Sequence, residues 1–449
     1  MTSSPPRDDA FAFDIGPALD GGDWSGTQKR IIALIACAII LDGFDNQVLG
    51  FTVPLLLREW QITRDALAPV FALGFVGMVI GTIFGGMLGD RVGRRPALIA
   101  SVLVFGIATG VTALVHSVAE LAICRIVAGF GLGGAMPVAA TLLAEFAPAR
   151  KRSMAVTLGI VCIPLGGVIG GLIAARILPV TGWRALFLIG GALPLVVATS
   201  LVALLPESPR FLVRRPERHS ALARLLAKLG HEVDLNGAFI DSHDVEKGRS
   251  ASIASLFARD WRRDTTALWI AFFSCLLTTY LVFSWAPALL AQAGFDIATS
   301  SLGLAIFNLG GVAGALGAAS VMPKLGSRPV MLTMAGGGVA GAALLAILPA
   351  GATATSLLLL ALAIEGGFIN AAQTSLYALS AQIYPAALRS TGVGAAAGIG
   401  RTGAIMSSFV GAAILAGGWS SYFAVLGLGM AVTFVALALI RGHLKGVGQ

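Results

Sequence analysis

Apolar runs of about 20 residues recur twelve times along this chain, and they constrain its fold more than any other feature. A helix needs about 20 predominantly apolar residues to cross a bilayer, and its internal hydrogen bonds satisfy the backbone there. Only 12% of the residues are charged, against about 25% in soluble domains. We therefore predict an all-α polytopic membrane protein. The predicted spans are residues 30–55, 66–89, 96–116, 118–143, 153–176, 183–205, 265–292, 299–322, 328–349, 353–382, 390–415 and 418–440.

The predicted spans divide into two groups of six, because the longest polar interruption follows the sixth span. The first residues lack the order of charged and apolar regions that marks a signal peptide. The predicted organisation is a cytoplasmic tail (1–29), an N-terminal six-helix half (30–205), a cytoplasmic central loop (206–264), a C-terminal six-helix half (265–441) and a short cytoplasmic tail (442–449).

Lysine and arginine are spread unevenly over the connections between spans. If both termini and every even-numbered connection are cytoplasmic, those segments hold 25 of the 31 Lys and Arg residues, as the positive-inside rule predicts. The high pI, near 9.7, is therefore interpreted as a consequence of topology. We expect a lipid bilayer and no nucleic acid as partner.

Two cytoplasmic sequences occur once in each half. GDRVGRRP (89–96) follows the second span and MPKLGSRP (322–329) follows the eighth. AEFAPARKRS (144–153) follows the fourth span and AQIYPAALRS (381–390) follows the tenth. A parallel repeat of six-helix halves is the architecture of the major facilitator superfamily.

The chain resembles that superfamily in its motifs as well. The loop signature GxxxDRxGRRP is present as Gly86, Asp90, Arg91, Gly93, Arg94, Arg95 and Pro96, and PESPRFL (206–212) is a second common element. DGFD (42–45), CRIVAGFGLGGAMP (124–137) and the segment 376–404 resemble the aromatic acid:H⁺ symporters of the superfamily. The resemblance implies proton-coupled import of an aromatic monocarboxylate of the hydroxybenzoate type across a bacterial inner membrane. We expect a monomer without cofactor or metal.

Two acidic residues lie inside the first apolar run. Charged residues at bilayer depth are costly and usually face a cavity or a partner. Asp42 and Asp45 share one helix face, roughly 18 and 22 Å from the start of the span at Arg30. Arg125, on a span that runs the other way, lies level with them. We predict a proton-coupling group of Asp42, Asp45 and Arg125, with a static salt bridge as the alternative. The resemblance also implies that these three positions are functional.

A second arginine lies at the bilayer midplane in the C-terminal half. Arg401 is roughly 16 Å from the cytoplasmic start of its span, and Glu365 has a similar depth. Transporter substrates bind near the midplane between the repeats, and a guanidinium suits a carboxylate. We predict that Arg401 binds the substrate, with neutralisation by Glu365 as the alternative. Glu365 itself is predicted to take part in proton coupling.

Aromatic and amide side chains at similar depths are candidates to complete a substrate pocket. Aromatic rings stack on Phe and Tyr, and buried amides need hydrogen-bond partners. For each aromatic residue the alternative is ordinary helix packing. The predicted substrate-binding residues, in addition to Arg401 and Arg125, are Phe44, Gln47, Tyr280, Asn308, Gln373 and Tyr377.

The cytoplasmic signature of the first half is predicted to act as a conformational switch. In the superfamily this motif resembles a latch that steadies the outward-facing state; its residues here are Asp90, Arg91, Arg94, Arg95 and Glu145. The second copy has Pro323 where Asp90 would stand. The glycine runs near residues 129–134 and 166–171 are interpreted as helix-packing sites, because no nucleotide-binding loop accompanies them.

Several function classes remain open at this stage. The leading hypothesis is import of an aromatic acid by proton symport, and its nearest rival is a proton-coupled exporter of another small organic anion. A receptor without transport activity ranks lower, since the central loop contains no evident signalling domain. An enzyme is not expected, because the sequence contains no recognisable catalytic or metal-ligand constellation.

Overall fold

The computed structural model describes residues 13–21, 24–231, 233, 238–242, 252–348 and 355–443. Twelve long apolar helices occur in this part of the chain, which confirms all twelve predicted spans. The N-terminal half contains α2 (Gly26–Trp60), α3 (Arg64–Val92), α4 (Arg94–Thr112), α5 (Val118–Phe146), α6 (Ala149–Thr181) and α7 (Trp183–Leu204). The C-terminal half contains α10 (Arg262–Gln292), α11 (Ile297–Leu325), α12 (Ser327–Ile347), α13 (Thr355–Ile383), α14 (Ala386–Leu415) and α15 (Gly418–Leu439).

Many helices extend a few residues beyond the predicted apolar spans. Several first turns are polar, so hydropathy does not detect them, and α2, α5 and α11 begin with a side-chain cap. At the start of α2, the Ser25 hydroxyl accepts from the Gln28 backbone at 3.1 Å, and the Gln28 side chain accepts from the Ser25 backbone at 2.8 Å. This capping box begins the helix four residues before the predicted start.

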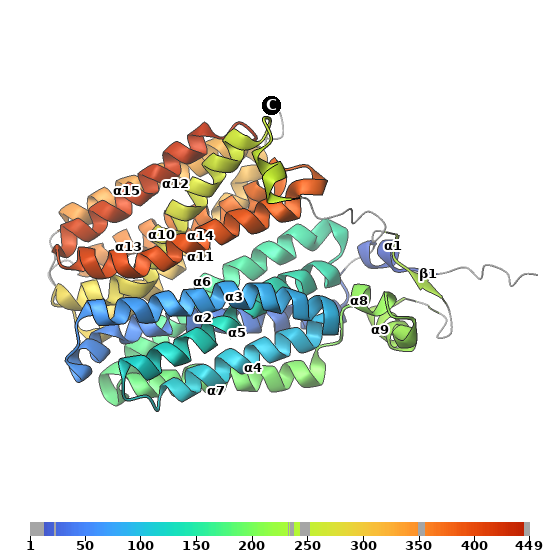
Figure 1. The fold of residues 1–449 in the computed structure, drawn as a ribbon, viewed down its shortest axis with the longest axis horizontal. Helices are drawn as coiled ribbons and strands as arrows, with labels where there is room; N and C mark the ends of the chain where they lie inside the picture. Colours follow the sequence, from blue (N-terminus) through green and yellow to red (C-terminus); the bar gives the residue numbers. More distant parts are fainter. Residues whose placement is uncertain are drawn as a thin grey trace, which may run out of the picture.

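The twelve helices form two bundles that lie side by side, blue to green and yellow to red in Figure 1. Within each bundle, glycines allow the closest approaches. A Cβ on Gly129 of α5 would collide with the Gly74 carbonyl of α3, and one on Gly366 of α13 would collide with the Phe307 carbonyl of α11. The interpretation of the first glycine run as a packing site is thereby confirmed.

The tight turn in each copy of the repeated signature has the same backbone conformation. Gly93 joins α3 to α4 with φ +123°, and Gly326 joins α11 to α12 with φ +84°. Residues with a Cβ rarely adopt these angles. The shared glycine is therefore explained by the turn, and it supports the duplication that the sequence predicts.

The halves contact each other through α2 with α10, α6 with α11 and α3 with α14. Gln47 bonds to Asn308, and the Phe71 and Trp285 rings lie 5.4 Å apart. These contacts lie in the middle of the bundle and in the part remote from the described chain ends.

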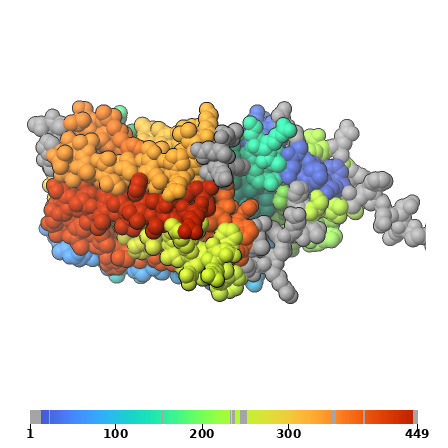
Figure 2. Space-filling model, turned by 90° about the horizontal axis from the view of Figure 1, so that it is seen from above, coloured from blue at the N-terminus to red at the C-terminus, as the bar shows by residue number. Residues whose placement is uncertain are grey.

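Short elements of the N-terminal tail and central loop form a small structure at the other end, which we call the cap. It consists of β1 (Phe13–Asp14), α1 (Ile15–Asp20), α8 (Pro209–Val213), η1 (Pro216–Arg218), α9 (His219–Leu229) and β2 (Phe239–Ile240). The strands β1 and β2 pair in parallel. Figure 2 shows residues of the two segments, in blue and in green, together at one end of the molecule. Hydropathy indicated none of these elements.

The cap is attached to the N-terminal half. Asp20 pairs with Arg152 of α6, Thr27 of α2 donates to the Lys228 carbonyl at 3.1 Å, and Arg215 donates to the Arg91 carbonyl at 2.6 Å. The short helix η3 (Ile253–Phe257), by contrast, lies against α10 and α14 of the other half.

Candidate functional site

A buried ion pair occupies the core of the N-terminal half. The Arg125 guanidinium on α5 lies 3.6 Å from an Asp45 carboxyl oxygen on α2. Thr109 donates to the other Asp45 oxygen and accepts from Arg125 at 3.1 Å, while Thr112 accepts from the same Arg125 nitrogen at 3.1 Å. Arg125 also lies over the Phe187 ring, 5.2 Å from its centroid. The predicted proximity of Arg125 and Asp45 is confirmed, and four neighbours hold the guanidinium in place.

Asp42 lies one turn away with fewer partners. It is 4% exposed, and one of its carboxyl oxygens has no hydrogen-bond partner in the described part of the chain. Its charged neighbours include Asp45, on the same helix, and Arg401 of α14. Asp42 therefore lies between Asp45 of the first half and the arginine of the second.

Arg401 projects from α14 toward the first half. Its guanidinium donates to the Met78 sulfur of α3 at 3.4 Å, a weak acceptor. No salt bridge involving Arg401 occurs among the described residues. It is only partly buried, and its charge acts on both Asp42 and the Tyr377 hydroxyl. The Arg401 guanidinium can therefore bind a ligand carboxylate without first breaking a salt bridge.

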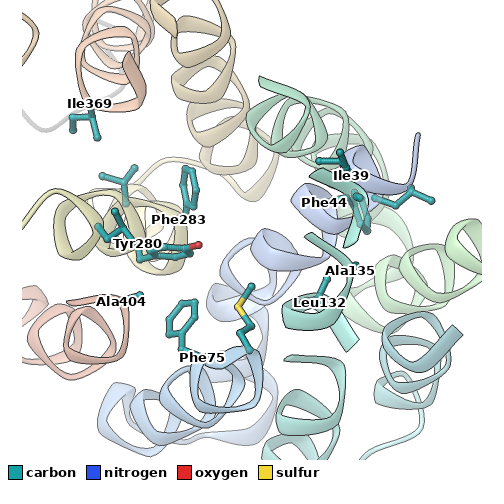
Figure 3. Close-up of a cluster of buried hydrophobic side chains, with 14 of the residues drawn as sticks. Ile39, Phe44, Phe75, Leu132, Ala135, Tyr280, Phe283, Ile369 and Ala404 are labelled. Atoms are coloured by element: carbon teal, nitrogen blue, oxygen red, sulfur yellow. The ribbon is translucent and has the colours of Figure 1, made fainter. Parts of the chain in front are cut away.

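Aromatic side chains from both halves meet beside these charges. The Phe75 ring on α3 lies 4.8 Å from the Tyr280 ring on α10, edge to face, and the Phe283 ring is 5.7 Å from Tyr280. Figure 3 shows Phe75 and Tyr280 facing each other across the boundary between the halves. Asn46 donates to the Tyr280 hydroxyl at 3.4 Å. A small cavity is lined by Phe75 of this ring pair together with Asn46, Asp45 and Arg125.

Two predicted pocket residues bond to each other across the halves. Gln47 donates to Asn308 at 3.3 Å, and Asn308 donates back to Gln47 at 2.8 Å. Both side chains are fully buried. In this conformation the amides join the two halves, and their predicted contact with substrate stays a prediction.

The other predicted pocket residues lie in different surroundings. The Phe44 ring lies inside the N-terminal half, where Cβ atoms on Gly170 or Gly190 would contact it, so packing accounts for its position. Tyr377 lies edge to face with Phe272, 5.1 Å between centroids. Gln373 is half-buried, and no hydrogen bond of its side chain occurs among the described contacts.

Glu365 does not lie beside Arg401. It faces the inside of the C-terminal half, toward Gly341 of α12 and a cavity between α10, α11 and α15. Depth along a helix follows from the rise per residue, but the direction of a side chain around the helix depends on the neighbouring helices. The alternative in which Glu365 neutralises Arg401 therefore has no support in this conformation.

The predicted switch residues form a network within the N-terminal half. Arg94 bonds to Asp90 at 2.8 Å and lies 3.8 Å from Glu145. Arg95 donates to the Val202 carbonyl at 2.5 Å, whereas Arg91 is exposed and offers its carbonyl to the cap. This network includes no described contact with the C-terminal half.

Several residues of these networks were missed at the level of sequence. Glu207 accepts from the backbones of Arg94, Arg95 and Ser208 at 2.8–3.1 Å. It was recognised only as part of PESPRFL. Thr109 and Thr112 resemble ordinary helix residues, and only their spacing of three, which puts both hydroxyls on one face, marks them.

Among the described residues, no group of three or more His, Cys, Asp or Glu side chains is placed to hold a metal ion.

Comparison with known proteins identifies a family model and near full-length relatives that match this chain. The profile of the Major Facilitator Superfamily matches residues 35–395 and 268–446. A gallate transporter of Pseudomonas putida is 35% identical over 97% of this chain and 94% of its own length. The 4-hydroxybenzoate transporter PcaK of Pseudomonas aeruginosa is 34% identical over 99% of this chain and 98% of its own length.

Solved structures agree on the fold. The xylose transporter XylE from E. coli, in a partially occluded inward-open conformation, has a TM-score of 0.73 at 19% identity, over 95% of this chain and all of that one. From the profile match, the near full-length relatives and the fold, the chain belongs to the major facilitator superfamily of membrane transporters.

Proposed function

We propose that this protein imports an aromatic monocarboxylate of the hydroxybenzoate type by proton symport, as a monomer in a bacterial inner membrane. The observation that carries the proposal is one small cavity lined by the buried Asp45–Arg125 pair and by Met78, to which the weakly bonded Arg401 donates. The Phe75 ring, which contacts Tyr280, lines the same cavity. Similarity to transporters of gallate and 4-hydroxybenzoate supports the substrate class.

The substrate carboxylate binds Arg401 in this proposal, and its ring lies against Phe75 and Tyr280. A guanidinium binds a carboxylate through paired hydrogen bonds, and the edges and faces of aromatic rings favour such contacts. The Asn46 amide, which already reaches the Tyr280 hydroxyl, is placed to bond to a ring substituent.

Proton coupling follows from competition for Arg401. While Asp42 is ionised, its charge attracts Arg401 and repels a second anion. Protonation of Asp42 removes both effects, so the substrate anion and the proton bind together. Asp45, paired with Arg125, is the second carboxyl of the relay, since protonating it would release Arg125 from its counter-charge.

The conformation described here is inward-open in this proposal. The positive-inside rule places the cap and both described chain ends in the cytoplasm. The contacts between halves, such as Gln47 with Asn308, then lie toward the outside, and alternating access requires them to open.

Uptake into proteoliposomes tests the proposal. Labelled 4-hydroxybenzoate is offered to vesicles with an inward proton gradient, with no gradient, and with a protonophore. We expect accumulation only with the gradient. Exchange without accumulation in all three conditions would contradict proton coupling.

The alternative is a proton-coupled exporter of another small organic anion. The basic midplane group favours anions in either case. An exporter would expel preloaded substrate against its gradient when the vesicle interior is alkaline, and it would transport non-aromatic acids equally well. Strict preference for benzoate-type acids would exclude this alternative.

A further inference from the structure

A carboxylic acid lies inside the apolar core of the C-terminal half, away from the central site. Glu365 of α13 is 1% exposed, and neither of its carboxyl oxygens has a hydrogen-bond partner among the described residues. It borders a small cavity between α10, α11 and α15. In a membrane protein an ionisable residue in such a position suggests a functional site.

The described side chains that face Glu365 include no positively charged group. α10 contributes Val282 and Leu289, α11 contributes Phe307, and α15 contributes Tyr422 and Leu426, while α12 presents Gly341. Tyr422 is the titratable member of this group, and its hydroxyl donates to the Leu281 carbonyl at 3.0 Å. An unpaired carboxylate is strongly disfavoured in such surroundings and takes up a proton instead.

The helix that carries Glu365 is closely packed on α11. A Cβ on Gly366 would collide with the Phe307 carbonyl, and one on Gly310 would collide with the Ala363 carbonyl. Little sliding between these two helices is therefore possible without rearrangement. The residue after Phe307 is Asn308, which holds Gln47 of the other half at 2.8 Å. The wall of the Glu365 cavity thus continues directly into a contact between the halves.

We propose that Glu365 is a second proton-binding site, separate from Asp42 and Asp45, which takes up its proton while the Gln47–Asn308 contact is open to the outside and holds it as a neutral acid in the conformation described here, before the proton is released to the cytoplasm. An ionised Glu365 would need water or a new partner in its cavity, so the wall formed by Phe307 would have to move. The inference rests on the proposed proton symport and extends it with a site in the second half.

Infrared spectroscopy tests the protonation directly and needs no substrate. Purified protein in liposomes at neutral pH is compared with Glu365→Gln. A neutral carboxylic acid has a carbonyl stretching band that a carboxylate lacks, so we expect this band to be weaker in the variant. Asp42→Asn is the matched control, and it should leave the Glu365 contribution in place. Identical carboxylic-acid bands in wild type and Glu365→Gln would show that Glu365 is ionised and would overturn the proposal.

Transport measurements test whether the proton moves. We expect Glu365→Gln to retain substrate exchange within about twofold of wild type and to lose at least about tenfold in proton-driven accumulation. Glu365→Asp, which keeps a titratable acid, should retain accumulation. Wild-type accumulation in Glu365→Gln would mean that the proton never leaves, and equal loss of exchange and accumulation would mean a structural role; either result overturns the proposal.

The two proposals fail in distinguishable ways. If wild type shows no proton-driven uptake of any aromatic acid, the proposed function fails, while the infrared comparison still decides whether Glu365 holds a proton. If wild type couples normally and only the Glu365 results disagree, the second proton site alone is wrong.

Discussion

The two halves of this protein share a fold but treat their buried charges differently. In the N-terminal half, Arg125 has Asp45, Thr109, Thr112 and the Phe187 ring as neighbours. In the C-terminal half, Arg401 has one weak bond to a methionine sulfur. The first half therefore holds its charges in a fixed arrangement, whereas the second leaves its cation available to a ligand.

The two copies of the cytoplasmic signature also differ in their charged residues, and the first copy is again the one with paired charges. Arg94 of the first copy bonds to Asp90 at 2.8 Å and to the Gly89 carbonyl at 2.9 Å. In the second copy Ser327 replaces that arginine and Pro323 replaces the acid. The turn at Gly93 and Gly326 is thus shared by both copies, whereas the ion pairs found among the described residues belong to the first copy.

The largest expected effect comes from breaking the buried Asp45–Arg125 pair of the N-terminal half. Asp45→Asn should abolish proton-driven accumulation and leave substrate exchange. It should also lower stability, since removing one partner of a buried pair typically costs about 3–5 kcal/mol. Uptake with a proton gradient and thermal unfolding in detergent measure the two effects.

Asp42→Asn is the matched control, because Asp42 lies outside the Arg125 cluster. It should lose accumulation with a smaller change in stability. Wild-type accumulation in both variants would remove the acid pair from the coupling mechanism.

The next largest effect is a loss of substrate affinity, expected when the weakly bonded Arg401 is replaced. Arg401→Ala should weaken substrate binding at least about tenfold, since a hydrogen bond to a charged group contributes about 1.5–3 kcal/mol. Arg401→Lys should restore little, because lysine lacks the planar fork. Unfolding of Arg401→Ala should stay close to wild type, whereas Arg125→Ala should be clearly destabilised. Isothermal titration and thermal unfolding check these outcomes.

The methyl ester of the substrate is the matched ligand control. It should bind wild type poorly and lose little further in Arg401→Ala. Equal losses for acid and ester would show that Arg401 does not recognise the carboxylate, and the comparison of the two arginines would then need another explanation.

A smaller effect should come from the threonines that position Arg125. Thr109→Val removes a hydroxyl that contacts both Asp45 and Arg125, whereas Thr112→Val removes a contact to Arg125 alone. We expect a several-fold loss of transport rate in the first and a lesser loss in the second. Equal transport rates in both variants would argue that Thr109 does not link the Asp45 carboxylate to the Arg125 guanidinium.

The smallest expected change in substrate affinity comes from Asp90, in the predicted conformational switch. The Asp90 side chain is 73% exposed and pairs only with Arg94 among the described ion pairs. Asp90→Asn should therefore slow transport while changing substrate affinity by less than about threefold, or about 0.7 kcal/mol. Glu207→Gln, which weakens an acceptor of three backbone N–H groups, is the comparison and should be less stable. A large loss of affinity with normal turnover in Asp90→Asn would contradict the assignment.

The sequence predicts the helices and the depth of residues along them, and it fails on directions around them. Apolar runs identify all twelve helices because each helix that crosses a bilayer needs a run of apolar residues. The same arithmetic of rise per residue places Arg125 level with Asp45, and the ion pair confirms it. It also places Glu365 level with Arg401, yet Glu365 faces another side of the bundle. That direction depends on which helices become neighbours, which a single sequence does not specify.

The sequence also fails to predict the surroundings of some residues and the short elements outside the twelve helices. Phe44 was expected in the pocket, but it packs against glycines of α6 and α7. The cap escaped prediction because its elements are too short to give an apolar run of membrane-spanning length, and its strands pair residues more than 200 positions apart. Such pairing leaves no local pattern.

The cap has a practical consequence for imaging this protein. Small membrane transporters offer few features outside the bilayer by which single particles can be aligned. The bonds of the cap, such as Asp20 with Arg152 and Arg215 with the Arg91 carbonyl, attach it to the N-terminal half. An antibody fragment raised against it would give each particle a rigid marker that turns with this half. Any change in angle between the marker and α10–α15 would then be a direct measure of how far one half rocks against the other.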